Sequence, residues 1–347
     1  MGSKDGPNWE GLLKWSLARS DGTGTARNIS EEDRKWFMEA MQSQSVDVVQ
    51  RMKEIVVVMK TPDDVLLSQG VTSDELEGML DELQDHVESI DMANDLYSIG
   101  GIHPLLNYLK STHPNIRAKA ADVVSTIVQN NPRSQELVMQ EKGLEPLLIN
   151  FLSDSDVNVR AKALGAISSL IRNNKPGVTA FRVGNGYSGL REALSSENVR
   201  FQRKALNLIH YLMTENRTDC TIVEELGISR NFVHLASSEN LDVREAALKN
   251  LLELAGYQKD QGQVKLGVDN PNLKEVLEER IENMNKMSTE EAAAARDEKQ
   301  LVEALWRLSY NEASPFRESV DLEEDEISPE ITSGSFNKPQ IPLALGL

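Results

Sequence analysis

The length, composition and charge of this chain exclude several classes of protein. With 347 residues, of which 39% are hydrophobic and only 5% aromatic, the sequence suits an elongated domain better than one large aromatic core. The 55 acidic and 37 basic residues give a formal net charge of −18, which disfavours binding to nucleic acid or anionic membrane surfaces and favours cationic partners.

Residues 1–28 are predicted to form a flexible N-terminal segment. The segment has no apolar leader for secretion, and the single cysteine, Cys220, cannot form an intrachain disulfide, so we expect a cytosolic protein. Residues 11–19 combine apolar side chains with two positive charges and no negative one, which makes them a candidate binding segment. A short amphipathic helix that docks on the protein's own end remains the alternative. The candidate residues are Leu12, Leu13, Lys14, Trp15 and Leu17.

Three amphipathic helices are predicted within residues 29–95. The first follows a capping-box pattern. The second carries apolar residues between positions 46 and 59 and should stop before Pro62, because proline disfavours helical backbone in the residue that precedes it. The third should begin at Thr72, with Glu75 completing a second capping box. We expect these helices to cover the N-terminal end of the repeats that follow.

Residues 96–258 contain three markers that recur with one period. Glycines at the start of similar segments are 42, 43 and 41 residues apart, and alanines that end a basic motif are 43, 42 and 42 apart. An asparagine that closes each unit keeps a spacing of 43. The glycines are Gly101, Gly143, Gly186 and Gly227, the alanines are Ala120, Ala163, Ala205 and Ala247, and the asparagines are Asn130, Asn173 and Asn216.

A repeat of this length, without the alternation of apolar and polar residues that is typical of strands, is characteristic of armadillo and HEAT repeats. Each unit has two or three helices and buries its apolar face only by stacking on its neighbours. We therefore predict an all-α fold, a right-handed armadillo-like helical-repeat solenoid of four repeats with helical caps and disordered ends. The small alanines should mark the places where neighbouring helices approach closely.

Two further segments follow the repeats. Residues 272–311 are predicted to form one or two C-terminal helices, because apolar residues recur there at helical spacing. Residues 312–347 contain the acidic run at 323–326, scattered prolines and no periodicity, and are predicted to be a disordered acidic tail.

No motif in the sequence favours catalysis or cofactor binding. Gly184, Gly186 and Gly189 match the spacing of a dinucleotide-binding loop, but such a loop follows a strand and the sequence before it is typical of a helix. The five histidines lack the spacing of metal ligands. We therefore expect a protein that is not an enzyme and that binds neither a cofactor nor a metal.

The inner surface of the predicted solenoid is the second candidate binding site, since the concave faces of solenoids bind extended or rounded partners. The last helix of each unit would place Asn130, Asn173, Asn207 and His210 on this surface. For the asparagines, capping of helix C-termini remains the alternative.

Several segments resemble the armadillo-type nucleotide exchange factors of the 70-kilodalton heat-shock chaperone, Hsp70. They are residues 12–17 (Leu-Leu-Lys-Trp-Ser-Leu), residues 88–95 (Glu-Ser-Ile-Asp-Met-Ala-Asn-Asp) and the four repeats through Tyr257. The resemblance covers most of residues 9–258 and is closest to the plant members of the family.

This resemblance implies a co-chaperone of the heat shock response. Its concave face would hold one lobe of the nucleotide-binding domain of Hsp70 and speed the release of ADP, so the chaperone and not this chain would bind the nucleotide. The resemblance also implies partner contacts at Ala93 and at the basic Arg203, to which we add the neighbouring Asn94. The N-terminal segment would mimic a chaperone substrate, engage the peptide-binding domain and promote release of the client.

Two other functions remain open. An armadillo adaptor for basic peptides would suit the acidic composition, but the sequence lacks the ladder of Trp-x-x-x-Asn motifs of such adaptors, because all four tryptophans lie outside the repeats. The solenoid could also serve as the scaffold of an enzyme or enzyme subunit. We expect the protein to be a monomer.

Overall fold

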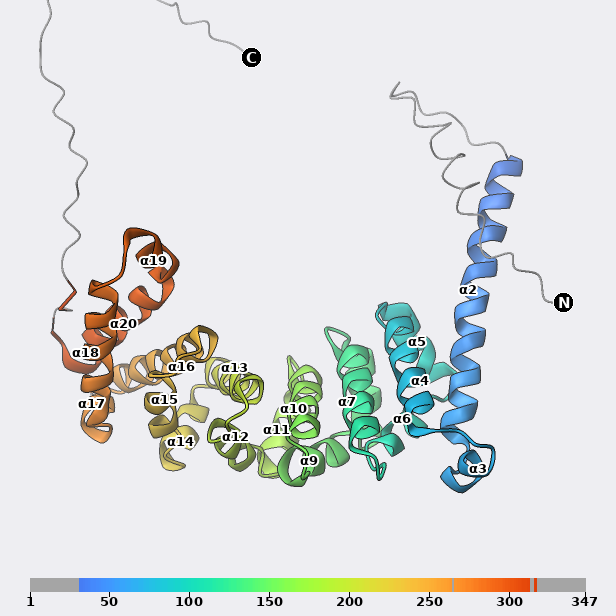
Figure 1. The fold of residues 1–347 in the computed structure, drawn as a ribbon, viewed down its shortest axis with the longest axis horizontal. Coiled ribbons are helices and arrows are strands. Elements are labelled where there is room, and N and C mark those ends of the chain that lie inside the picture. Colours follow the sequence, from blue (N-terminus) through green and yellow to red (C-terminus); the bar gives the residue numbers. More distant parts are fainter. Residues whose placement is uncertain (1–30, 264, 313–314, 317–347) are drawn as a thin grey trace, which may run out of the picture.

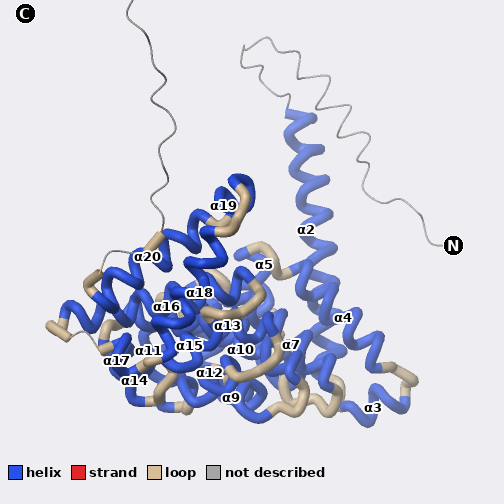
Figure 2. The backbone as a smooth tube through the Cα atoms, turned by 60° about the vertical axis from the view of Figure 1, so that its left-hand side comes forward, coloured by secondary structure: helices blue, strands red, loops and turns tan. Residues whose placement is uncertain are grey.

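A computed structural model of the chain describes residues 31–263, 265–312 and 315–316, and its helices follow one another along an arc (Figure 1). Helices and loops account for the whole described part, in which no strand occurs (Figure 2). Helix α2 rises at one end of the arc, and helices α18 to α20 rise at the other. The prediction of an all-α fold is therefore confirmed.

The N-terminal helices are α2 (Glu31–Lys60), α3 (Asp63–Ser68) and α4 (Ser73–His86). We predicted two separate helices before Pro62, whereas the structure has one, because no glycine or proline interrupts the sequence between Glu31 and Lys60. The predicted capping box of α4 is confirmed. The backbone N–H of Glu75 donates to the Thr72 hydroxyl at 3.3 Å, and the backbone N–H of Thr72 donates to the Glu75 carboxylate at 2.8 Å.

A unit of three helices then occurs four times. The first helices are α5 (Ile90–Ser98), α8 (Pro132–Gln140), α11 (Lys175–Val183) and α14 (Thr218–Glu225). The second helices are α6 (Ile102–Tyr108), α9 (Leu144–Ser153), α12 (Gly186–Leu194) and α15 (Ser229–Leu235). The third and longest helices are α7 (Pro114–Val128), α10 (Val157–Ile171), α13 (Val199–Glu215) and α16 (Leu241–Asp260). The boundary that we placed between residues 95 and 96 falls inside α5, the first helix of the first unit.

Close packing explains three of the four periodic glycines. A Cβ atom on Gly143 would lie 2.6 Å from a methyl group of Val138, and a Cβ atom on Gly101 or Gly186 would overlap a side chain of the preceding helix, Leu96 or Phe181. In these three units the start of the second helix therefore lies directly against the first helix, where only glycine fits. Gly227 differs, because it has open space around it and a φ of +66° that favours glycine.

The third helices stack in chain order, α7 on α10, α10 on α13 and α13 on α16. All four periodic alanines on these helices are completely buried, which confirms that the small residues lie where helices approach closely. Helix α4 precedes this stack, packed on α7, and the C-terminal helix α20 extends it, packed on α16. One row of helices thus runs through the whole described chain.

Residues 272–311 contain three helices, whereas we predicted one or two. They are α18 (Asn272–Asn285), α19 (Thr289–Ala294) and α20 (Arg296–Tyr310), and the short helix α17 (Leu266–Asp269) precedes them. Leu273, Leu277, Ile281 and Leu305 are buried and belong to the same core as the repeats. A capping box at Ser288, completed by Glu291, starts α19 and separates it from α18.

Candidate partner-binding surface

The third helices lie on the side of the arc that faces its hollow, and the second helices lie on the opposite side (Figure 1). We call the uncovered faces of α7, α10, α13 and α16 the inner surface. On α13 this face carries, at helical spacing, Arg200, Arg203, Lys204, Asn207, His210 and Tyr211.

Lysines connect neighbouring third helices along the inner surface. Lys119 of α7 forms an ion pair with Asp81 of α4, and Lys162 of α10 forms one with Asp122 of α7. Lys204 of α13 again reaches back to the preceding helix, but there it donates to the backbone carbonyl of Ala161 at 3.0 Å. In three successive units, the lysine of the basic repeat motif therefore contacts the preceding helix of the stack. Only the lysine of the third unit, Lys204, has no acidic side chain at contact distance.

Lys204 lies at the centre of a group of positive charges. Its side chain passes over Gly165 of α10, where a Cβ atom would come within 2.5 Å of the ammonium. Burial lowers the pKa of Lys204, and although Asp122 raises it, the charges of Lys162, Arg200 and Arg203 lower it further. We call these four basic residues the cationic cluster.

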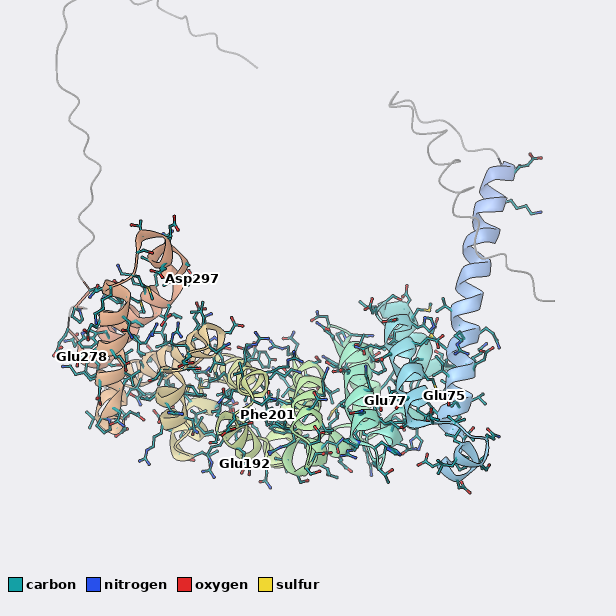
Figure 3. The ribbon with its side chains drawn as sticks, in the orientation of Figure 1. Glu75, Glu77, Glu192, Phe201, Glu278 and Asp297 are labelled. Atoms are coloured by element: carbon teal, nitrogen blue, oxygen red, sulfur yellow. The ribbon has the colours of Figure 1, made fainter. Side chains whose placement is uncertain are left out.

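Helices α10 and α13 are mainly basic, since α10 contains no acidic residue and α13 contains only Glu215. Figure 3 shows Glu75 and Glu77 at the α4 end, Glu278 and Asp297 on the C-terminal helices, and Glu192 of α12 on the outer side in the middle of the arc. The middle of the inner surface thus differs in charge from the chain as a whole, whose formal net charge is −18.

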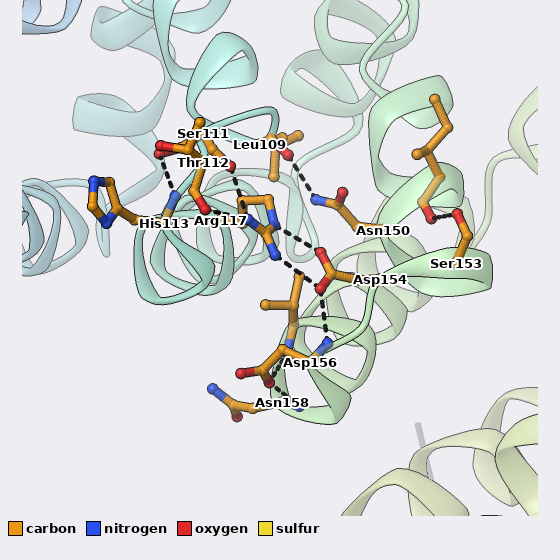
Figure 4. A network of polar contacts seen from close by, with 12 residues as sticks. Leu109, Ser111, Thr112, His113, Arg117, Asn150, Ser153, Asp154, Asp156 and Asn158 are labelled. Carbon is orange, nitrogen blue, oxygen red and sulfur yellow. Dashed lines mark hydrogen bonds and ion pairs between the residues drawn. The ribbon is translucent and has the colours of Figure 1, made fainter. Parts of the chain in front are cut away.

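Arginines at the start of the third helices hold neighbouring units together. Arg117 of α7 donates from Nε and Nη2 to the two oxygens of Asp154, which precedes α10, at 2.7 and 2.9 Å (Figure 4). Its Nη1 also donates to the carbonyl of Ser111 at 2.8 Å. Burial raises the pKa of Asp154, but the hydrogen bond from Arg117 is among the interactions that together hold it below its usual value. Such a two-pronged bond fixes orientation as well as distance, so the curvature of the inner surface is built into the fold.

The same position is basic in two further units and is a glutamine in one. Arg160 donates to the carbonyl of Phe151 at 2.9 Å and to Glu192 of α12 at 3.0 Å. Gln202 donates to the carbonyl of Ser196 at 2.6 Å.

The predicted asparagines have well-defined backbone roles. Asn130 and Asn173 have φ values of 53° and 56°, in the left-handed region that asparagine adopts more readily than most residues. The residues after them, Asn131 and Asn174, accept hydrogen bonds from backbone N–H groups of the next helix and cap its N-terminus. This geometry agrees with the alternative that Asn130 and Asn173 end helices rather than contact a partner.

The other predicted contact residues differ in exposure. Ala93 is 1% exposed and faces the core, so it can influence a partner only through the position of α5. Asn94 also points inward, since its Oδ1 accepts hydrogen bonds from Asn131 at 3.4 Å and from Ser134 at 3.3 Å. Arg203 and Asn207 are exposed on α13, and Arg203 forms an ion pair with Asp242 of α16.

His210 is half-buried on the same face of α13, and its Nδ1 has no hydrogen-bond partner within the described chain. Nδ1 is itself buried from solvent, and burial lowers the pKa of His210, so the ring is neutral near pH 7. The adjacent Tyr211 stacks against the guanidinium of Arg172, whose Cζ lies 4.6 Å from the ring centroid, and its hydroxyl accepts a hydrogen bond from the backbone N–H of Asn173 at 2.8 Å.

Sequence reasoning missed Arg200, Lys204 and Tyr211. The first two are three and one residues from Arg203, and their spacing on one helix face was the available signal.

The candidate segment with Leu12, Leu13, Lys14, Trp15 and Leu17 lies outside the described residues. Within the described residues, no group of three or more histidine, cysteine or acidic side chains is arranged to hold a metal ion. None of the described helices combines the length and apolar character needed to cross a bilayer.

Comparison with known proteins shows the same architecture in solved structures. A designed armadillo repeat protein superposes with a TM-score of 0.58 at 17% identity, over 74% of this chain and 99% of that one. A computationally designed armadillo repeat protein for modular peptide recognition gives a TM-score of 0.57, also at 17% identity. These similarities show that the fold is an armadillo-like solenoid.

Sequence comparison identifies the family. The model of the nucleotide exchange factor Fes1 matches residues 9–96, and the model of the SIL1/FES1/HPBP1 C-terminal domain matches residues 92–230. Hsp70-binding protein 1 of Homo sapiens is 26% identical over 256 residues, 71% of each chain. The Hsp70 nucleotide exchange factor FES1 of Yarrowia lipolytica is 34% identical over 130 residues, 38% of this chain and 42% of the relative. The predicted closeness to plant members stays a prediction. The chain belongs to the Fes1/SIL1/HPBP1 family of Hsp70 nucleotide exchange factors.

Proposed function

We propose that this chain is a co-chaperone that binds the nucleotide-binding domain of an Hsp70 chaperone through its inner surface and accelerates the release of ADP. The observation that carries the proposal is the family match, which runs from residue 9 to residue 230 and includes the third helices α7, α10 and α13. The relatives are named for Hsp70 binding and for nucleotide exchange.

The physical basis of exchange is linkage between two ligands of the chaperone. A protein that binds the ADP-free conformation of the chaperone more tightly must weaken ADP binding, and ADP must weaken protein binding by the same factor. This function requires a rigid, shaped surface and no reaction of its own. The bond between Arg117 and Asp154 supplies rigidity, because it locks one unit to the next.

Within the inner surface, α13 is the proposed centre of contact. Arg203 and Asn207 are exposed there, and His210 lies half-buried beside them. We propose that Ala93 and Asn94 act indirectly by fixing α5 against α8, because both side chains face inward. Asn130 and Asn173 are retained as candidate contacts only through the loops that they shape.

Release of a fluorescent ADP analogue from purified Hsp70 tests the proposal. The full chain should accelerate release, and Arg200→Ala combined with Arg203→Ala should raise the concentration needed for half-maximal acceleration by about tenfold, the typical loss when exposed interface cations are removed near a contact centre. Arg191→Ala is the matched control, because Arg191 is an exposed arginine on α12, on the outer side of the arc. No acceleration by the full chain at saturating concentration would refute the proposal.

The N-terminal segment is proposed to compete with clients for the peptide-binding domain of the chaperone. Replacing both Leu13 and Trp15 by alanine should leave ADP release intact and slow the release of a bound fluorescent peptide. Equal slowing of both processes would instead assign the segment a role in folding of this chain.

The charge of the inner surface argues against an adaptor for basic peptides. Lys162, Arg200, Arg203 and Lys204 lie where such a peptide would bind, and like charges repel it.

We further propose that the protein acts as a monomer in the cytosol. Light scattering of the purified chain tests the monomeric state, and fractionation of cells tests the localisation.

A further inference from the structure

The cationic cluster on the inner surface contains more positive charge than its neighbours neutralise. Lys162 pairs with Asp122, and Arg203 pairs with Asp242. Arg200 is exposed and makes no ion pair within the described part of the chain, and the ammonium of Lys204 contacts only a backbone carbonyl. Two carboxylates therefore face four cations, so an additional anionic group would bind there favourably.

The C-terminal sequence of the same chain contains a complementary charge. Between residues 318 and 330 it has seven acidic residues and no basic one. They are Glu318, Asp321, Glu323, Glu324, Asp325, Glu326 and Glu330.

The acidic segment is tethered within reach of the cluster. Phe316, the last described residue, lies with its ring 5.0 Å from the ammonium of Lys299 on α20. Helix α20 packs on α16, and α16 packs on α13, so α13 is two helix spacings away, each about 8–10 Å. The 14 residues from Phe316 to Glu330 can span up to about 46–50 Å when extended, which exceeds this distance even if the chain bends around the end of the arc.

We propose that residues 318–330 of this chain dock on the cationic cluster of α10 and α13 and occupy the middle of the inner surface. A tether of this length gives an effective concentration near the millimolar range, so contacts that would be weak between separate molecules are populated within one chain. Because the contact is electrostatic and exposed to solvent, salt screens it over about 8–10 Å at physiological ionic strength.

The contact has a consequence for function that rests on the proposed Hsp70 binding. A docked acidic segment covers Arg203, so it competes with the chaperone and lowers the apparent affinity of this chain for it. Neutralising the segment should therefore lower the concentration needed for half-maximal ADP release by a few-fold. Docking itself is measured without chaperone, so a failure of the exchange function leaves the docking test unaffected.

The test is acetylation of lysines in the full-length protein, followed site by site with mass spectrometry. One variant combines Glu323→Gln, Glu324→Gln, Asp325→Asn and Glu326→Gln. Acetylation of Lys204 and Lys162 should be about threefold or more faster in this variant than in the parent, and 0.5 M salt should abolish the difference, in line with screening. Lys53 and Lys142, which are exposed and distant in the fold, should react equally in both proteins.

A matched control removes the same number of charges elsewhere in the C-terminal part. It replaces Glu275, Glu278, Glu279 and Glu282, all exposed on α18, by glutamine, and it should leave Lys204 as slow as in the parent. Carbodiimide coupling of mixed heavy-labelled and unlabelled protein then identifies the source of the carboxylates. Links from Lys204 to residues 318–330 of the same chain are expected. Equal acetylation in parent and tail variant, or links only between different chains, would overturn the proposal.

Discussion

Glu298 of α20 is completely buried, and its two carboxylate oxygens accept hydrogen bonds from Nε and Nη2 of Arg244 on α16 at 2.7 and 2.8 Å. Arg280 of α18 donates a third hydrogen bond to the same carboxylate at 2.9 Å. One acidic side chain thus joins the last repeat to two helices of the C-terminal part. Arg244 also donates to the carbonyl of Ser238 at 2.7 Å, as Arg117 does to that of Ser111.

Removing one partner of this buried group should be costly. Arg244→Ala leaves the Glu298 carboxylate buried with only Arg280 beside it, so we expect a loss of about 3–5 kcal/mol in the free energy of unfolding. Urea denaturation of the purified chain measures it. Lys286→Ala is the control, because Lys286 pairs with Glu282 on the surface of α18 and its removal should change stability little. Similar losses from both substitutions would show that burial of Glu298 does not matter.

The same group should make stability depend on pH. Burial raises the pKa of Glu298, but the hydrogen bonds and charges of Arg244 and Arg280 outweigh it, and the pKa in the folded protein lies below its usual value of about 4.3. A depressed pKa means that the unfolded chain binds the proton first, so the stabilisation is complete above the unfolded pKa and is lost as pH falls through the folded pKa.

Thermal unfolding between pH 7 and pH 3 tests this pH dependence. The difference in Tm between the parent and Glu298→Gln should be largest near pH 7 and should shrink below about pH 4, where the parent loses its advantage. A difference that grows on acidification would contradict the assigned direction of the pKa shift.

The repeats could be predicted from sequence because their markers report local contacts. Gly143 is required by Val138 five residues earlier, and the buried alanines are required by the neighbouring helix, so each constraint recurs with every unit. The continuity of α2 was missed because a gap in the apolar pattern does not end a helix that contains neither glycine nor proline.

The charge of the inner surface was harder to predict. Overall composition is acidic, and the positive cluster exists only because stacking brings Lys162 of α10 beside Arg200, Arg203 and Lys204 of α13. Sequence spacing shows which residues share a face of one helix, but it does not show which acids of the next helix remain within reach. The inward orientation of Ala93 was hidden for the same reason, since it depends on the packing of α5 against α7 and α8.

Two glycines in helices provide a test of the packing explanation. Gly186→Ala places a Cβ atom 2.3 Å from Cζ of Phe181, so it should destabilise the chain by about 1–3 kcal/mol through overpacking. Gly78, in α4, has no atom within 4 Å of an added Cβ, and Gly78→Ala should stabilise the protein by up to about 1 kcal/mol through helix propensity. Chemical denaturation of both variants gives the comparison. The opposite signs are the result that matters, and stabilisation by Gly186→Ala would show that this glycine is not a packing requirement.

Substitutions of Asn173 can distinguish a role in ending α10 from a role in binding the chaperone. Its φ of 56° costs an alanine about 1–2 kcal/mol, whereas glycine adopts it freely, and both substitutions keep the backbone N–H that donates to the Tyr211 hydroxyl at 2.8 Å. If Asn173 only ends α10, Asn173→Gly should match the parent in stability and in acceleration of ADP release, and Asn173→Ala should lose about 1 kcal/mol of stability. Unfolding and nucleotide-release measurements on the same preparations distinguish the roles. A glycine variant that folds as stably as the parent but accelerates ADP release less would place the Asn173 side chain in contact with the chaperone, because only the side chain has then been removed.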